Sequence, residues 1–125
     1  MILVDTNVLI DYFNGSDLII DSLSDTEDIA TCGIILAELF HGVKSKNEKT
    51  EISEALADFQ WISIPENLWW EVGDNLNLMK KKGLTVPFQD AIIATLSIQN
   101  DLYLLTKDKH FSEIAKILPL KLYKQ

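Results

Sequence analysis

The sequence predicts a single α/β domain over residues 1–125, with a mainly parallel central sheet. Short apolar runs, which suit buried strands, alternate along the chain with segments whose apolar residues recur at helical spacing. This alternation is typical of domains built on a parallel sheet. The 125 residues contain no repeat, low-complexity tract or linker. A chain of this length buries roughly two-thirds of its unfolded surface, so it can form a core without disulfides.

The first half of the chain opens with a strand. Residues 2–4 are apolar and end at polar residues, which predicts a buried strand that meets a loop. Apolar residues then recur at helical spacing from Val8 to Phe13, and Asn14-Gly15 ends this helix. The elements expected next are a helix at 16–23, a strand at 29–32, a helix at 35–43 and a helix at 46–59.

A strand at 61–64 precedes the longest predicted helix, at 66–82, which ends where three lysines meet Gly83. Trp69 and Trp70 are adjacent in this helix and face different directions, so we expect one in the core and the other partly exposed or at a partner surface. Pro87 opens the next helix, because proline suits the first helical position. The remaining elements expected are this helix to residue 99, a strand at 103–106, a helix at 111–118 and a strand at 120–123.

The charge balance excludes a simple basic nucleic-acid binder. The chain has 19 acidic and 11 basic residues, a net charge of −8, and every basic residue is Lys. Proteins that bind nucleic acid through their own surface field are usually basic. Binding of a polyanion would therefore need a bound cation or a local cluster of lysines, whereas an acidic surface also serves solubility alone.

Several other classes of protein are disfavoured. The single cysteine, Cys32, excludes an internal disulfide and a zinc site built on paired thiolates. No apolar run approaches the ~20 residues of a membrane span, and the first residues do not resemble a signal peptide. We therefore expect a protein of the reducing cytoplasm.

Carboxylates stand where an ordinary surface would not place them. Asp5, Glu38 and Asp90 are each the only charged residue in a stretch of ten or more residues. Asp108 directly follows the strand predicted at 103–106. Burial of an unpaired charge costs several kcal/mol, so such isolated acids need a partner.

The expected positions of these acids point to one site. Asp5 and Asp108 follow strands, Asp90 lies in the first turn of a helix, and Glu38 lies on a helix face. If the strands are parallel neighbours, all four can meet at one edge of the sheet. Two carboxylates ~5 Å apart repel by about 3 kcal/mol at an effective dielectric of 20. Such a cluster needs raised pKa values or a cation, and Mg²⁺ or Mn²⁺ suits oxygen ligands.

Simpler interpretations of each acid remain open. Asp5 can cap the helix that follows it. Glu38 can pair with a distant Lys, and Asp90 can interact with the helix macrodipole. Asp108 stands between two lysines and fits a solvated turn. The only imidazoles are those of His41 and His110, which disfavours a softer metal with nitrogen or sulfur ligands.

Four short motifs surround these acids, namely Val4–Asp11 (VDTNVLID), Leu36–Gly42 (LAELFHG), Val86–Ala94 (VPFQDAIIA) and Leu105–Phe111 (LTKDKHF). They resemble the motifs of PIN-domain nucleases, in the same order and at similar spacing. The resemblance extends over residues 2–123. The compact length of this chain is also similar to that of the VapC-type toxins of bacterial and archaeal toxin–antitoxin pairs.

The resemblance implies a three-layer α/β/α PIN-like fold and a metal-dependent endoribonuclease that uses Mg²⁺ or Mn²⁺. It also implies an RNA substrate, a cognate antitoxin and a homodimer as partners. The implied catalytic and metal-binding residues are Asp5, Glu38, Asp90 and Asp108, with Asp5 and Asp90 preferred as direct ligands. The implied supporting residues are Thr6, Asn7 and Thr106 beside the acids, and Lys107 and Lys109 for contact with phosphate. One position departs from the motif, because His110 precedes Phe111 where Asp is common.

Rival functions fit the residues less well. A haloacid-dehalogenase-like phosphatase needs a second Asp where Asn7 stands, and a phospho-receiver needs an acceptor Asp that residues 61–65 lack. A PIN-like scaffold without activity would not need four acids. A housekeeping RNA-processing nuclease remains the main alternative to a toxin.

Overall fold

A five-stranded parallel sheet forms the centre of the computed structural model, which describes residues 1–15, 19–24 and 28–124. This confirms the predicted α/β class. The strands are β1 (Ile2–Val4), β2 (Ile29–Cys32), β3 (Gln60–Ile62), β4 (Tyr103–Leu105) and β5 (Lys121–Leu122). The helices are α1 (Thr6–Phe13), α2 (Ile19–Ser24), α3 (Gly33–His41), α4 (Lys46–Leu56), α5 (Leu68–Lys81), α6 (Phe88–Gln99) and α7 (His110–Ala115).

The strand order is β3-β2-β1-β4-β5, so the direction in which the sheet grows reverses beside β1. The chain adds β2 and β3 on one side of β1 and then returns to add β4 and β5 on the other. Val4 lies beside Leu105, and the N–H of Asp5 donates to the Leu105 carbonyl (2.9 Å). The loops after β1 and β4 are therefore neighbours at the point of reversal, where parallel sheets commonly bind ligands.

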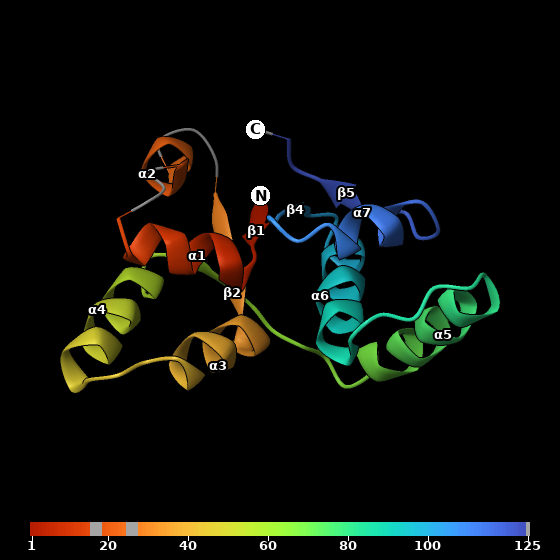
Figure 1. Cartoon of the computed structure of the whole chain (residues 1–125), viewed down its shortest axis with the longest axis horizontal. Coiled ribbons are helices and arrows are strands. Elements are labelled where there is room, and N and C mark those ends of the chain that lie inside the picture. The colour runs from red at the N-terminus through yellow and green to blue at the C-terminus, as the bar shows by residue number, and fades with distance from the viewer. Residues whose placement is uncertain (16–18, 25–27, 125) are drawn as a thin grey trace.

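Helices lie on both sides of the strands. Figure 1 shows α1 to α4 on one side of the view and α5 to α7 on the other. Helix α6 is the most enclosed, because residues 91–97 are all buried. The hydroxyls of Thr95 and Ser97 donate to carbonyls one turn earlier (2.7 and 2.9 Å), so these polar groups are satisfied inside the core. The packing of α6 fixes its first turn, which carries Asp90.

Helix α5 corrects one expectation about the tryptophans. Both are exposed, Trp69 by 45% and Trp70 by 80%. The buried stripe of α5 consists of Leu68, Val72 and Met79, which follow each other at helical spacing. Because Leu68 begins this stripe one position before Trp69, neither tryptophan faces the core.

The boundaries of several elements differ from those predicted, and partner strands explain the clearest case. The strand expected at 61–64 is β3, which ends at Ile62 because its neighbour β2 ends opposite it, at Cys32. Residues 16–18, at the start of the helix expected at 16–23, lie outside the described residues. Among the helices that are described, none is long and apolar enough to cross a membrane.

Candidate active site

Asp5 occupies the end of β1 and is buried, with 6% of its surface exposed. Its Oδ1 accepts the N–H of Thr6 (2.8 Å), so Asp5 caps α1 as the simpler interpretation proposed. Its Oδ2 accepts the hydroxyl of Thr106 (2.7 Å), which follows β4. One carboxylate therefore both begins a helix and joins two loops, because its two oxygens face different partners.

Asn7 and Thr106 extend this connection between the loops. The Asn7 amide donates to both Asp5 Oδ2 and Thr106 Oγ1 (3.4 Å each), and its Oδ1 accepts the N–H of Lys107 (3.1 Å). Thr106 Oγ1 also accepts the N–H of Asp108 (3.0 Å). The loop that carries Asp108 is thus held against Asp5 by side chains that the sequence placed beside the acids.

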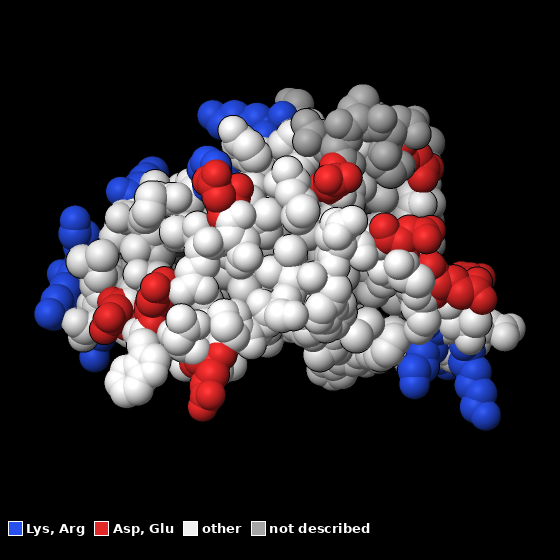
Figure 2. Space-filling model, turned by 180° about the vertical axis from the view of Figure 1, so that it is seen from behind, with Lys and Arg blue, Asp and Glu red and all other residues white. Residues whose placement is uncertain are grey.

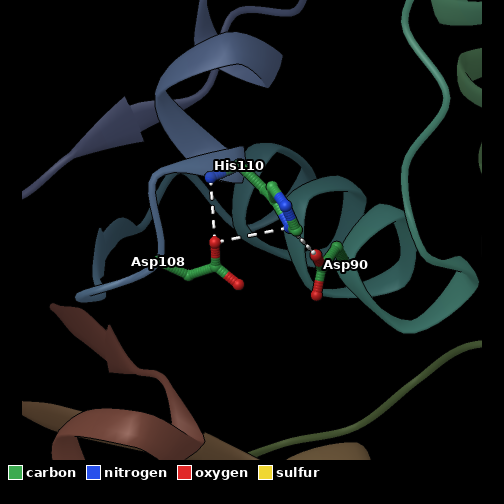
Figure 3. Close-up of side chains that lie close together, drawn as sticks. All are labelled: Asp90, Asp108 and His110. Carbon is green, nitrogen blue, oxygen red and sulfur yellow. Dashed lines mark hydrogen bonds and ion pairs between the residues drawn. The ribbon is translucent and has the colours of Figure 1, made fainter.

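Asp90, Asp108 and His110 form a second group next to Asp5. One ligand atom from each of the three lies within 4.8 Å of the others. Figure 3 shows the His110 ring between the two carboxylates, with Nδ1 3.4 Å from Asp90 Oδ2 and 3.4 Å from Asp108 Oδ1. The side chain of Asp90 is 13% exposed and that of Asp108 34%. The sequence-based prediction of site residues does not include His110. Its position in the motif Leu105–Phe111, two residues after Asp108, is the signal that could have identified it.

Glu38, on α3, faces the same region and has an uncompensated oxygen. Its Oε1 is buried without a hydrogen-bond partner in the described parts of the chain, as is Thr6 Oγ1. Burial raises the pKa of Glu38, and the charges of Asp5 and Asp90 raise this pKa further, whereas the nearby Thr6 side chain lowers it in part. No Lys or His pairs with Glu38 among the described residues, so the structure does not support the alternative of a distant Lys.

The other acids share this electrostatic strain. Burial raises the pKa of Asp5. The hydrogen bonds from Thr106 and Thr6 lower this pKa in part, and the charge of Asp108 raises it. Burial likewise raises the pKa of Asp90. The contact with His110 lowers this pKa in part, and the charges of Asp108 and Asp5 raise it. Each of the four acids therefore lies within electrostatic reach of at least two of the others, and their repulsion favours a bound cation.

Because Glu38 is buried near other carboxylates, the metal-free variant Glu38→Gln should be more stable than the metal-free wild type, and this difference should depend on pH. The unfolded carboxyl ionises near its ordinary pKa of 4.5, whereas the raised pKa keeps the folded carboxyl protonated to higher pH. As pH rises from the ordinary pKa toward the raised pKa of the folded state, the free energy of unfolding of the wild type decreases. Glu38→Gln should therefore unfold at a higher urea concentration than the wild type at pH 7. Below pH 4.5 the two proteins should unfold at the same urea concentration.

Urea titrations at both pH values, with chelator present, check this result. Glu54→Gln, on the exposed surface of α4, is the matched control and should show no pH-dependent difference. A wild type that is at least as stable as Glu38→Gln at pH 7 would contradict the prediction.

The two lysines expected at the phosphate differ in their surroundings. The ammonium of Lys107 pairs with Asp11 on α1, and both side chains are about two-fifths exposed. Lys109 is exposed at the start of α7. In the rear view of Figure 2, lysines lie near the edges of the molecule, and acidic side chains are spread over the face between them.

A cavity of about 520 Å³ adjoins the acids at Glu38. Of the four acids, only Glu38 lines it, so the cavity extends away from Asp5 and Asp108. Its wall combines apolar side chains with three glutamates and one lysine. The residues concerned include Phe13, Leu39, Ile52, Glu48, Glu51 and Lys44.

Comparison with known proteins identifies relatives over nearly the full length of the chain. A family model described as "PIN domain" matches residues 2–117. Ribonuclease VapC1 of Methanocaldococcus jannaschii is 29% identical over 122 residues, which cover 98% of this chain and 86% of that protein.

Solved structures are similar over the same length. A crystal structure of VapBC2 from Rickettsia felis, bound to a DNA fragment from its promoter, gives a TM-score of 0.84 at 25% identity, covering 100% of this chain and 99% of the other. VapBC-1 from nontypeable Haemophilus influenzae gives 0.81 at 22% identity, with coverage of 99% and 98%, and this similarity supports the fold alone.

Proposed function

This chain belongs to the PIN domain family, whose model matches residues 2–117, and from this premise we propose that it is a metal-dependent endoribonuclease. It hydrolyses phosphodiester bonds of RNA and acts as the toxin of a toxin–antitoxin pair. Residues 1–125 function as one domain. The observation that carries the proposal is the group of neighbouring carboxylates: Asp90 and Asp108 have ligand atoms within 4.8 Å of each other, and Glu38 Oε1 is buried with no hydrogen-bond partner among the described residues.

The residues of the site fit a hard divalent ion. Their oxygens suit Mg²⁺ or Mn²⁺, and the buried Glu38 Oε1 is an acceptor that such an ion would satisfy. Asp5 and Asp90 would hold the ion directly, and Glu38 and Asp108 would bind it directly or through water. When bound by these acids, a divalent ion would lower the pKa of an attacking water and would stabilise charge on the phosphate oxygens.

The remaining residues orient these acids and the RNA. The Thr6 N–H and the Thr106 hydroxyl fix both oxygens of Asp5, so its carboxylate cannot rotate freely. Asn7 links the same carboxylate to the loop of Asp108. Lys107, which pairs with Asp11, and Lys109 lie on that loop and would contact phosphate.

Cleavage of a mixed cellular RNA pool tests the proposal. The wild type should cut RNA with Mg²⁺ or Mn²⁺ and stop when the ion is chelated. Asp90→Asn should cut about a hundredfold more slowly, because it removes a charge from the site, and Glu38→Gln should also be slower. The exposed Asp74→Asn on α5 is the control and should keep full activity. Folded wild type that leaves every RNA intact would overturn the proposal.

Metal binding should also stabilise the fold. A ligand that binds only the folded state, at one hundred times its dissociation constant, adds about 2.7 kcal/mol. For a domain of this size the melting temperature should rise by roughly 10 °C. Calorimetric melts with millimolar Mg²⁺ or Mn²⁺ measure this rise, and Asp90→Asn should reduce it. An unchanged melting temperature at saturating ion would argue against a site formed in the folded state.

A cognate antitoxin and a homodimer complete the proposal. The solved structure from Rickettsia felis is of VapBC2, which supports a partner of the antitoxin type. The cavity beside Glu38 would accept a partner segment with apolar and basic side chains, because glutamates outnumber lysine in its wall. The exposed Trp70 supports a further protein contact.

Co-purification with the product of the adjacent reading frame tests the antitoxin, and light scattering of each form tests the dimer. Discrete RNA fragments would favour a toxin over a housekeeping nuclease.

A further inference from the structure

The ring of His110 has a position that the proposed function does not use. His110 begins α7, and its backbone N–H donates to Asp108 Oδ1 (2.9 Å). Its Nδ1 lies 3.4 Å from both Asp108 Oδ1 and Asp90 Oδ2. Both ring distances exceed the usual hydrogen-bond range of about 2.7–3.2 Å. The nitrogen lies at ion-pair distance from both carboxylates and therefore faces the gap between them (Figure 3).

The spacing of these three donors is close to that around one ion. In octahedral coordination with bonds of about 2.1 Å, neighbouring ligand atoms are about 3 Å apart. The two separations of 3.4 Å from Nδ1 approach this value, and all three donor atoms lie within 4.8 Å of one another. The His110 side chain is 59% exposed, so the ring can turn toward an ion without moving core side chains. The next residue, Phe111, is fully buried and holds the backbone in place.

We propose that His110 is a nitrogen ligand of the metal ion held by Asp90 and Asp108, and that it biases the site toward Mn²⁺ over Mg²⁺. The proposal rests on the metal-dependent function proposed above. Mg²⁺ favours oxygen ligands and retains its waters, whereas first-row transition ions accept imidazole nitrogen. A donor set of two carboxylates and one imidazole therefore differs from the all-oxygen site that the sequence predicts.

Separate calorimetric titrations of the full chain with Mn²⁺ and with Mg²⁺ test this selectivity. His110→Ala should weaken Mn²⁺ binding at least about tenfold, as loss of a metal-site partner commonly does, and Mg²⁺ binding by less than about threefold. His110→Asp supplies oxygen instead of nitrogen and should favour Mg²⁺ relative to the wild type. The matched control is His41→Ala, at the exposed end of α3, which should change neither affinity.

Pulsed electron paramagnetic resonance of bound Mn²⁺ gives a readout that does not depend on activity. Nitrogen-14 modulation from a coordinated imidazole should appear in the wild type and in His41→Ala, and should be lost in His110→Ala. If the wild type binds Mn²⁺ and cleaves RNA but shows no nitrogen modulation and no change of selectivity in His110→Ala, this inference fails and the proposed function stands. If the wild type binds Mg²⁺ but no Mn²⁺, the inference fails and the proposed function stands, whereas binding of neither ion would overturn both.

Discussion

Replacement of Asp5 by Asn is expected to slow RNA cleavage by about a thousandfold, the upper end of the usual loss for a group that stabilises charge in a transition state. Asp5 is the most buried of the four acids, and its two oxygens join the loops after β1 and β4. Asn keeps the shape of the side chain and an oxygen that can accept the Thr6 N–H, whereas its amide nitrogen can no longer accept the Thr106 hydroxyl. It removes the negative charge on which the proposed ion depends, so the loss should exceed that of Asp90→Asn.

The same substitution should leave the metal-free fold intact. Burial raises the pKa of Asp5, so its charged form destabilises the folded state at neutral pH, and Asn removes that charge. Single-turnover cleavage rates and urea titrations with chelator measure the two effects. The exposed Asp58→Asn provides the control, with wild-type activity and stability expected. If Asp5→Asn keeps more than about a tenth of wild-type activity, Asp5 is not a catalytic residue and acts only as the cap of α1.

Replacement of Phe111 by Ala is expected to cost about 3–5 kcal/mol of the free energy of unfolding. Phe111 is fully buried, and it anchors α7 directly after His110. Removal of a buried aromatic ring loses its contacts and leaves a cavity that the core fills only in part. Because domains of this kind are stable by roughly 5–15 kcal/mol, the variant should be near the limit of folding at 37 °C.

Urea titration at 15 °C, where a destabilised variant remains folded, measures the loss. Phe88→Ala is the matched control, because Phe88 is 58% exposed at the start of α6 and should change stability by less than about 1 kcal/mol. Phe111→Leu should lose less than Phe111→Ala, since it retains most of the buried volume. Equal losses at Phe111 and Phe88 would show that α7 is not anchored by its aromatic ring.

The sequence predicts the class of fold because the relevant signals are local. The apolar run at Ile2–Val4, the polar residues after it and the spacing of apolar residues in each helix all depend on neighbours along the chain. The same holds for the acids, because Asp5, Glu38 and Asp90 are isolated in apolar segments and therefore need partners. The prediction that one of the adjacent tryptophans lies in the core was wrong, because a shift of one position along α5 places Leu68, and not Trp69, in the core.

The sequence by itself thus determined the order of the elements and a set of acids that cannot all stay charged without compensation. It could not determine that β4 returns to lie beside β1, because strand order is decided by packing between segments a hundred residues apart. That neighbourhood brings Thr106 to Asp5 and carries Asp108 to the same edge of the sheet. The His110 ring reaches the gap between Asp90 and Asp108 for the same reason: α6 and α7 meet only in the folded chain, where nonlocal burial fixes both helices.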